Sequence, residues 1–165
     1  MPIERRFPLP GLTLAAEVWG AAEGRPLLAS HGWLDNAGTF ERLAPLLPDC
    51  EIVAVDSAGH GFSDSRSPDA SYNLWHDVGD LLDVMEALGW QRCTLLGHSR
   101  GAAISMLFAA TFPERVDKLV LLGQKIWKIV EAGRPVGNFA SQRADVLPQG
   151  ISQWQSLGGW EVPVS

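Results

Sequence analysis

The stretch Leu95-Leu96-Gly97-His98-Ser99-Arg100-Gly101 sets the local geometry on which the rest of this chain depends. Apolar residues typical of a strand lead into it, and a segment of small residues typical of a helix follows it. The pattern G-x-S-x-G is typical of a nucleophile elbow, a sharp strand-to-helix turn that exposes a serine hydroxyl at the edge of a sheet. Side chains at Gly97 and Gly101 would collide where the two backbones approach each other, and glycine removes the Cβ that collides. Ser99 also lies at the positive N-terminal end of the following helix, which favours negative charge.

Length and composition narrow the class of protein. The 165 residues predict a single domain, and an apolar fraction of 46% is enough to bury a core. A net charge of −6, without any lysine or arginine run, argues against nucleic acid or an anionic membrane as a partner. The N-terminal residues lack the apolar segment of a secretory signal, and no apolar run is long enough to cross a bilayer. Cys50 and Cys93 lack metal-ligand spacing, so we expect reduced thiols in a cytoplasmic protein without a metal site.

Short apolar segments alternate with helical patterns along the first 123 residues. This alternation predicts an α/β fold with a mostly parallel sheet and flanking helices. Strands are expected at residues 3–9, 12–19, 27–30, 52–55, 94–97 and 116–122. Helices are expected from an N-cap at Asp35 or Asn36 to Pro48, from Leu74 to Leu88, and from Arg100 to the residue before Pro113.

Residues 74–88 carry the clearest helical pattern. Their apolar residues recur at spacings of three and four, which predicts one buried stripe: Leu74, Val78, Leu81, Leu82, Met85 and Leu88. The acidic residues of the same segment are expected to face water: Asp77, Asp80, Asp83 and Glu86. Gly89 is expected to end the helix.

The composition changes after Gly123. Five of the six glutamines follow this residue, mixed with tryptophan, glycine and proline. We therefore expect residues 124–165 to be an atypical tail that allows a short helix near residues 124–132 and is otherwise irregular. The strand at 116–122 would then be an exposed apolar edge, which favours self-association with another chain.

Three signatures stand in one order along the chain. They are His31-Gly32-Trp33, the D-x-x-G-x-G-x-S loop from Asp56 to Ser63, and the elbow around Ser99. Together they resemble the α/β-hydrolase fold superfamily. The runs His31-Gly32-Trp33-Leu34-Asp35-Asn36-Ala37 and Phe112-Pro113-Glu114-Arg115-Val116-Asp117-Lys118-Leu119 are most similar to its serine hydrolase-like proteins. The resemblance covers residues 1–123 and implies a fold truncated after the strand at 116–122, with the C-terminal part absent.

The resemblance implies a serine hydrolase of esterase type that needs no cofactor and acts on a small-molecule ester or acyl substrate. Ser99 would be the nucleophile, and the backbone N–H groups of Trp33 and Arg100 would form the oxyanion hole. A serine at the elbow, rather than an aspartate, favours acyl transfer. The other motif residues would be structural: His31, Gly32, Asp56, Gly59, His60, Gly61, Ser63, Gly97 and Gly101.

The expected catalytic histidine is missing from this sequence. In this fold the triad runs in chain order serine, acid, histidine, but the four histidines all precede Ser99: His31, His60, His76 and His98. Loss of the histidine from such a triad lowers the rate on the order of a millionfold. The sequence therefore leaves two readings open: a serine hydrolase that is inactive or very weak as this chain, and a non-catalytic protein that binds a small acyl ligand or a protein partner.

Overall fold

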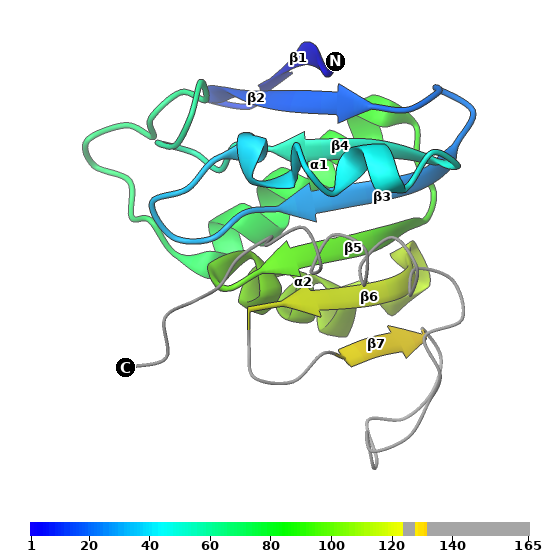
Figure 1. The fold of residues 1–165 in the computed structure, drawn as a ribbon. Helices are drawn as coiled ribbons and strands as arrows, with labels where there is room; N and C mark the ends of the chain where they lie inside the picture. Colours follow the sequence, from blue (N-terminus) through cyan, green and yellow to red (C-terminus); the bar gives the residue numbers. More distant parts are fainter. Residues whose placement is uncertain (124–127, 132–165) are drawn as a thin grey trace, which may run out of the picture.

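The structure is a computed structural model that describes residues 1–123 and the backbone of residues 128–131 (Figure 1). Seven strands form one sheet in the order β1-β2-β4-β3-β5-β6-β7. The strands are β1 (Ile3–Leu9), β2 (Leu12–Trp19), β3 (Arg25–Ser30), β4 (Cys50–Val55), β5 (Cys93–His98), β6 (Val116–Leu122) and β7 (Lys128–Glu131). The four strands β4, β3, β5 and β6 run parallel, while β1, β2 and β7 pair antiparallel with their neighbours. The α/β fold with a mostly parallel sheet is confirmed.

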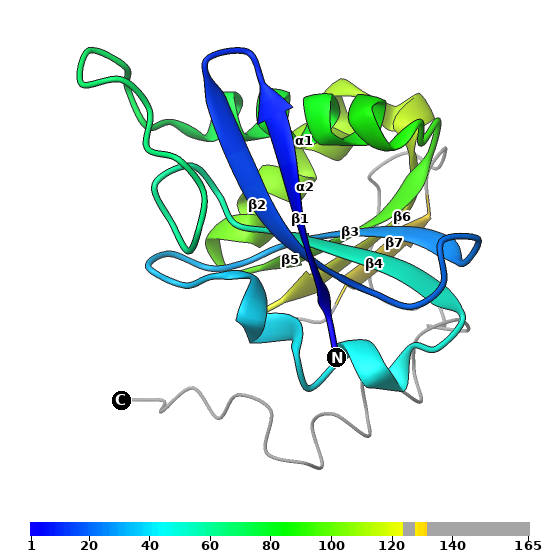
Figure 2. The ribbon, with the colours of Figure 1, turned by 90° about the horizontal axis from the view of Figure 1, so that it is seen from above.

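Helices cover both faces of the sheet unequally. The helices α1 (Leu74–Leu88) and α2 (Arg100–Thr111) lie on one face, and the short 3₁₀ helices η1 (Ala37–Phe40) and η2 (Ala44–Leu46) lie on the other (Figures 1 and 2). Successive strand residues point to opposite faces. Leu28 and Val53 accordingly belong to the core cluster under α1 and α2, whereas Leu27 and Ile52 belong to the cluster under η1 and η2.

The segment after β3 differs from the expected helix. Two separate 3₁₀ helices replace one α-helix between Asn36 and Pro48. Asn36 is the N-cap, because its side chain accepts the Gly38 N–H at 2.9 Å. Pro45 explains the interruption, since proline has no N–H for an i−4 hydrogen bond and its ring clashes with the preceding turn.

The edge beside β6 also differs from expectation. Residues 128–131 form the strand β7 rather than part of a helix, and Ile129 and Val130 pair with Val120 and Leu119. β-branched residues favour this extended pairing. The prediction that the strand at 116–122 is a bare edge is therefore wrong, while self-association of the chain stays a prediction. The remaining tail residues, 124–127 and 132–165, lie outside the described part of the chain.

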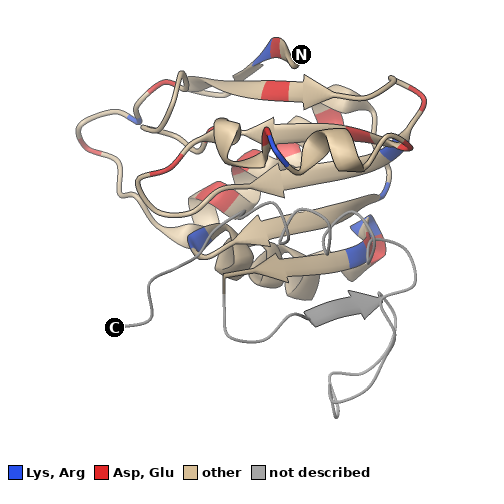
Figure 3. Cartoon of the chain, in the orientation of Figure 1, with Lys and Arg blue, Asp and Glu red and all other residues tan. Residues whose placement is uncertain are grey.

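Helix α1 ends at Gly89, as the sequence predicts, but its buried face is rotated relative to the predicted stripe. The Asn73 side chain accepts the His76 N–H, and Gly89 ends the helix with a left-handed φ of +70°. Asp77 and Asp80 are buried, at 7% and 8% exposure, so the prediction that they face water is wrong. Figure 3 shows that the charged residues of the described part lie mainly in loops and helices, while β5 carries none. No helix among the described residues is both long enough and apolar enough to span a membrane.

Candidate active site

Ser99 occupies the strained backbone of a nucleophile elbow. Its φ is +50° and its ψ is −110°, and Leu34 is the other non-glycine residue with positive φ in the described part of the chain. Such a conformation costs about 1–3 kcal/mol and persists only where the surrounding structure holds it. Here the Ser99 N–H donates to the Leu122 carbonyl at 2.9 Å, and the Ser99 carbonyl accepts the Ala102 N–H at 3.0 Å. The elbow is thus fixed to the end of β6 and to the start of α2.

The two glycines of the motif are required by close backbone contacts. A Cβ at Gly101 would lie 2.1 Å from the Ser30 carbonyl oxygen, and a Cβ at Gly97 would lie 2.4 Å from the Gly101 carbonyl oxygen. Real Cβ atoms do not approach backbone oxygens this closely. The collision that the sequence predicts at both positions is therefore present in the structure.

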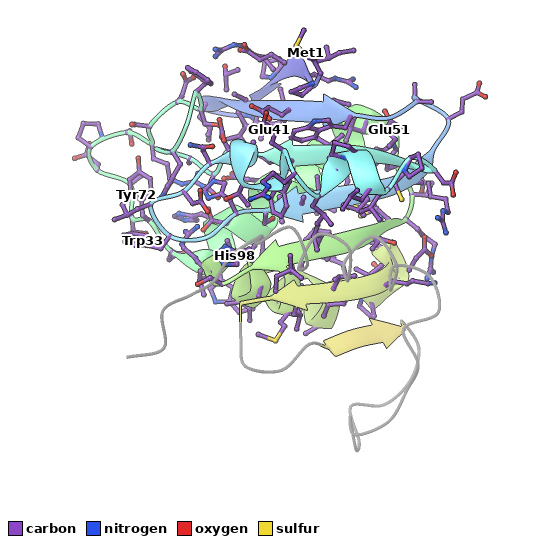
Figure 4. The ribbon with its side chains drawn as sticks, viewed as in Figure 1. Met1, Trp33, Glu41, Glu51, Tyr72 and His98 are labelled. Carbon is purple, nitrogen blue, oxygen red and sulfur yellow. The ribbon has the colours of Figure 1, made fainter. Side chains whose placement is uncertain are left out.

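Trp33 and Ser99 lie at the same edge of the sheet. Ser30 and Gly97 are register partners on β3 and β5, so the residues that follow them leave the sheet side by side. A Cβ at Gly32 would lie 3.5 Å from Ser99 Cβ. Figure 4 shows Trp33, Tyr72 and His98 at this end of the sheet, away from Glu51 on β4. The Trp33 side chain is 61% exposed there.

Hydrogen bonds from Asp56 and Ser63 hold the loop between these two residues in place. The Asp56 carboxylate accepts the Ala37 N–H at 2.7 Å and the Phe62 N–H at 2.8 Å. The Ser63 hydroxyl donates to the Asp56 carbonyl at 2.6 Å and accepts the Ala15 N–H at 2.8 Å. Gly61 has a φ of +50°, and its Cβ would lie 2.0 Å from the Asp56 carboxylate. These contacts agree with the structural role that the sequence predicts for Asp56, Ser63 and Gly61.

His31 has no nitrogen left to accept a proton from Ser99. The ring is fully buried, and its Nε2 accepts the Ser57 N–H at 3.0 Å. Because a backbone N–H can only donate, the ring proton must sit on Nδ1, which donates to the Gly32 carbonyl at 2.7 Å. Burial lowers the pKa of His31. The side chain therefore joins the loops after β3 and β4 as a neutral imidazole.

His60 lies in the loop after β4, and His76 lies on α1. Nδ1 of His60 lies 3.1 Å from the Ala58 carbonyl, and its ring packs 5.8 Å from the Trp33 ring in an edge-on contact. His76 is exposed on the first turn of α1, as the sequence predicts, and its Nδ1 lies 2.7 Å from the Ser71 carbonyl. Among the described residues, neither ring makes a hydrogen bond to the Ser99 hydroxyl. Gly59, with a φ of +75°, lies against the Tyr72 ring.

His98 is packed tightly between two glycines. A Cβ at Gly32 would lie 2.8 Å from its Nδ1, and a Cβ at Gly123 would lie 2.7 Å from its Cδ2. Nδ1 also lies 3.9 Å from an Asp35 carboxylate oxygen. Burial lowers the pKa of His98 to about 4, against the opposing effect of Asp35. The imidazole is neutral at pH 7 but is a weak base.

We expect this packing to make the protein sensitive to acid. Because the pKa of His98 falls from 6.5 to about 4 on folding, the unfolded chain binds a proton first, and stability declines as pH drops from 6.5 towards 4. The loss from this one group amounts to about 3 kcal/mol at most. Urea unfolding at a series of pH values should show this decline, and His98→Gln should flatten it. The exposed His76→Gln serves as a control, and an equal flattening by that variant would contradict the assignment.

Two buried ion pairs lie behind the elbow, and sequence reasoning missed both. Arg100 Nη2 lies 2.5 Å from Asp77 Oδ2, with side-chain exposures of 13% and 9%. Arg66 forms the second pair with Asp80. Burial raises the pKa of Asp80, although Arg66 opposes this shift. A signal was available in the sequence, because Asp77 lies three residues after Leu74 and four before Leu81, on the same helical stripe.

The comparisons with known proteins agree with this geometry. The family model described as the alpha/beta hydrolase fold matches residues 25–154. This chain belongs to the alpha/beta hydrolase fold family. The match continues beyond residue 123, into the segment whose composition differs. Among the described residues, no group of three or more histidine, cysteine or acidic side chains could hold a metal ion.

Three proteins similar to this chain illustrate the relationship. The human serine hydrolase-like protein is 48% identical over 120 residues, which cover 72% of this chain and 59% of that protein. The crystal structure of a hypothetical protein from Pseudomonas aeruginosa superposes with a TM-score of 0.72 at 42% identity, covering 98% of this chain and 55% of the other. A thioesterase domain from the curacin biosynthetic pathway superposes with a TM-score of 0.69 at 28% identity, covering 73% of this chain and 46% of the other. The chain thus spans about half to three fifths of the length of these relatives.

Proposed function

We propose that the chain carries the nucleophile of an esterase-type serine hydrolase, with Ser99 as the attacking residue. The observation that carries this proposal is the strained Ser99 backbone at the end of β5, with φ +50° and glycines where a Cβ would collide. Strained backbone of this kind clusters at active sites. The similarity to serine hydrolase-like proteins supports the same residue and chemistry.

The proposed reaction is acyl transfer from a small ester or thioester. The Ser99 oxygen attacks the carbonyl carbon, its proton leaves to a base, and the collapse of the tetrahedral intermediate expels the alcohol or thiol. The N–H groups of Trp33 and Arg100 would stabilise the oxyanion, since both residues start segments beside Ser99 at the edge of the sheet. Water then attacks the acyl carbon and gives a proton to the base, and the bond to the Ser99 oxygen breaks, which releases the acid and returns a proton to Ser99.

Among the described residues, no histidine forms a hydrogen bond to the Ser99 hydroxyl and could act as its base. The sequence holds no histidine after Ser99, His31 is committed at both nitrogens, and the pKa of His98 is about 4. Both acylation and deacylation need a base. We therefore expect slow formation of the acyl-enzyme and slow breakdown of it.

A mass measurement tests this proposal. The chain is incubated with p-nitrophenyl acetate, digested and mapped, and an acetyl group is expected on the peptide that contains Ser99. Because deacylation is also slow, the adduct should accumulate towards one per chain. Ser99→Ala should lack it. A folded chain that never forms this adduct would favour the second candidate function, non-catalytic binding of a small acyl ligand or a protein partner, which the missing histidine supports.

A further inference from the structure

The two ion pairs of α1 connect this helix to different segments of the chain. Asp77 and Asp80 lie one turn apart on the same side of the helix, and both are buried. Asp80 holds Arg66, which belongs to the loop after β4, whereas Asp77 holds Arg100, the residue that follows Ser99. Only the Asp77 pair therefore reaches the elbow.

The backbone of Arg100 belongs to the elbow, while its side chain contacts the loop after β3. Its backbone begins α2 directly after Ser99, and its guanidinium carbon lies 5.5 Å from the centre of the Trp33 ring. An arginine above an indole face at this distance is attracted to it, more strongly when water is excluded. The Arg100 side chain is 13% exposed, so its guanidinium is largely shielded from water.

The indole of Trp33 would otherwise have few partners. It is 61% exposed, and its second ring contact in the described structure is the edge-on packing with His60. A side chain with so little burial samples several rotamers unless a neighbour holds it. The guanidinium of Arg100 can do this only while it is itself fixed, and Asp77 fixes it at 2.5 Å.

We propose that Asp77 is a positioning residue that acts through Arg100 to hold the Trp33 indole beside Ser99. The inference rests on the proposed function, since the fixed indole would form the wall against which the acyl group lies. The same link would keep the two expected oxyanion donors, the N–H groups of Trp33 and Arg100, at a constant separation. Small displacements of such groups lower reaction rates strongly.

The pair Arg66–Asp80 provides a matched control for this proposal. It is an arginine–aspartate pair of similar burial whose aspartate lies on the same helix, but in the described part of the chain Arg66 contacts neither Trp33 nor the elbow. Asp77→Asn and Asp80→Asn should therefore destabilise the fold to a similar extent. Their effects on Trp33 should differ.

The test uses the full chain labelled with 5-fluorotryptophan. Seven fluorine resonances are expected from the seven tryptophans, and Trp33→Phe assigns one of them. Asp77→Asn should shift or broaden the Trp33 resonance, and Asp80→Asn should leave it in place. The double variant Asp77→Asn/Arg100→Met, which leaves no buried charge unpaired, should give the same change as Asp77→Asn. An unchanged Trp33 resonance in both Asp77 variants would overturn the proposal.

A kinetic readout separates this inference from the proposed function. Acylation of Ser99 by p-nitrophenyl acetate should slow by about tenfold or more in Asp77→Asn. In Asp80→Asn it should stay within about threefold of the parent chain, because Asp80 contacts neither Trp33 nor Arg100. Absence of any adduct in the parent chain overturns the proposed function, while the fluorine resonances still decide whether Asp77 positions Trp33.

Discussion

Replacement of Gly101 by alanine is expected to destabilise the fold by about 4 kcal/mol or more, an effect at the upper end for single substitutions. The new Cβ would lie 2.1 Å from the Ser30 carbonyl oxygen and 2.7 Å from that of His31. Both atoms belong to the backbone at the end of β3, so no side chain can move aside. Either α2 or β3 must shift, and both are packed in the core. Urea unfolding followed by circular dichroism measures the change.

Gly79 offers the control for this substitution. It lies in the interior of α1, is exposed, and has no atom within 4 Å of where its Cβ would be. Alanine there should stabilise the chain by about 0.5–1 kcal/mol, because glycine is a poor helix former. Destabilisation of less than 1 kcal/mol by Gly101→Ala would contradict the close contact between α2 and the end of β3.

Ester hydrolysis by this chain is expected to be on the order of a millionfold slower than that of an enzyme with a complete triad. The reason is that no described histidine forms a hydrogen bond to the Ser99 hydroxyl. His31 is engaged at both nitrogens, and His98 holds a proton only in acid because its pKa is about 4. The release of p-nitrophenol from a short ester, with Ser99→Ala as the background, measures this rate.

A turnover of about 1–1,000 per second, the ordinary range for enzymes, would contradict this expectation. It would require a base within the chain. His60→Gln would then identify His60 as that base if it abolished the activity, since its ring lies 5.8 Å from that of Trp33.

The sequence was sufficient for features that depend on local chemistry. Gly97 and Gly101 predict a close approach because no other residue fits it, and the structure shows that approach. Asn36 and Gly89 mark helix ends through their own hydrogen bonding and left-handed backbone. The apolar run 52–55 within β4 is typical of a strand buried on both faces, and all four of its residues are buried. Each of these signals lies within a few residues of its effect.

Features that depend on distant partners could not be predicted in the same way. Asp77 can be buried because it pairs with Arg100, and Asp80 because it pairs with Arg66. Both arginines lie in other segments, and no local sequence pattern predicts these pairings. Strand β7 forms because β6 offers an unpaired edge, although its own four residues are a weak strand signal. Helix η1 ends early because of Pro45, a local signal that the apolar spacing of the segment obscured. The oxyanion role of Trp33 and Arg100 stays a prediction.

The most direct test of the account is the labelling of the folded chain with a fluorophosphonate probe, compared with Ser99→Ala. The account holds that Ser99, half-buried on a strained elbow, is the nucleophile but lacks a base. It therefore predicts no labelling within minutes at micromolar probe, and slow labelling over hours that depends on Ser99. Rapid labelling within minutes would show that a base is present, and equal labelling of Ser99→Ala would show that Ser99 is not the nucleophile. Either result would contradict the account.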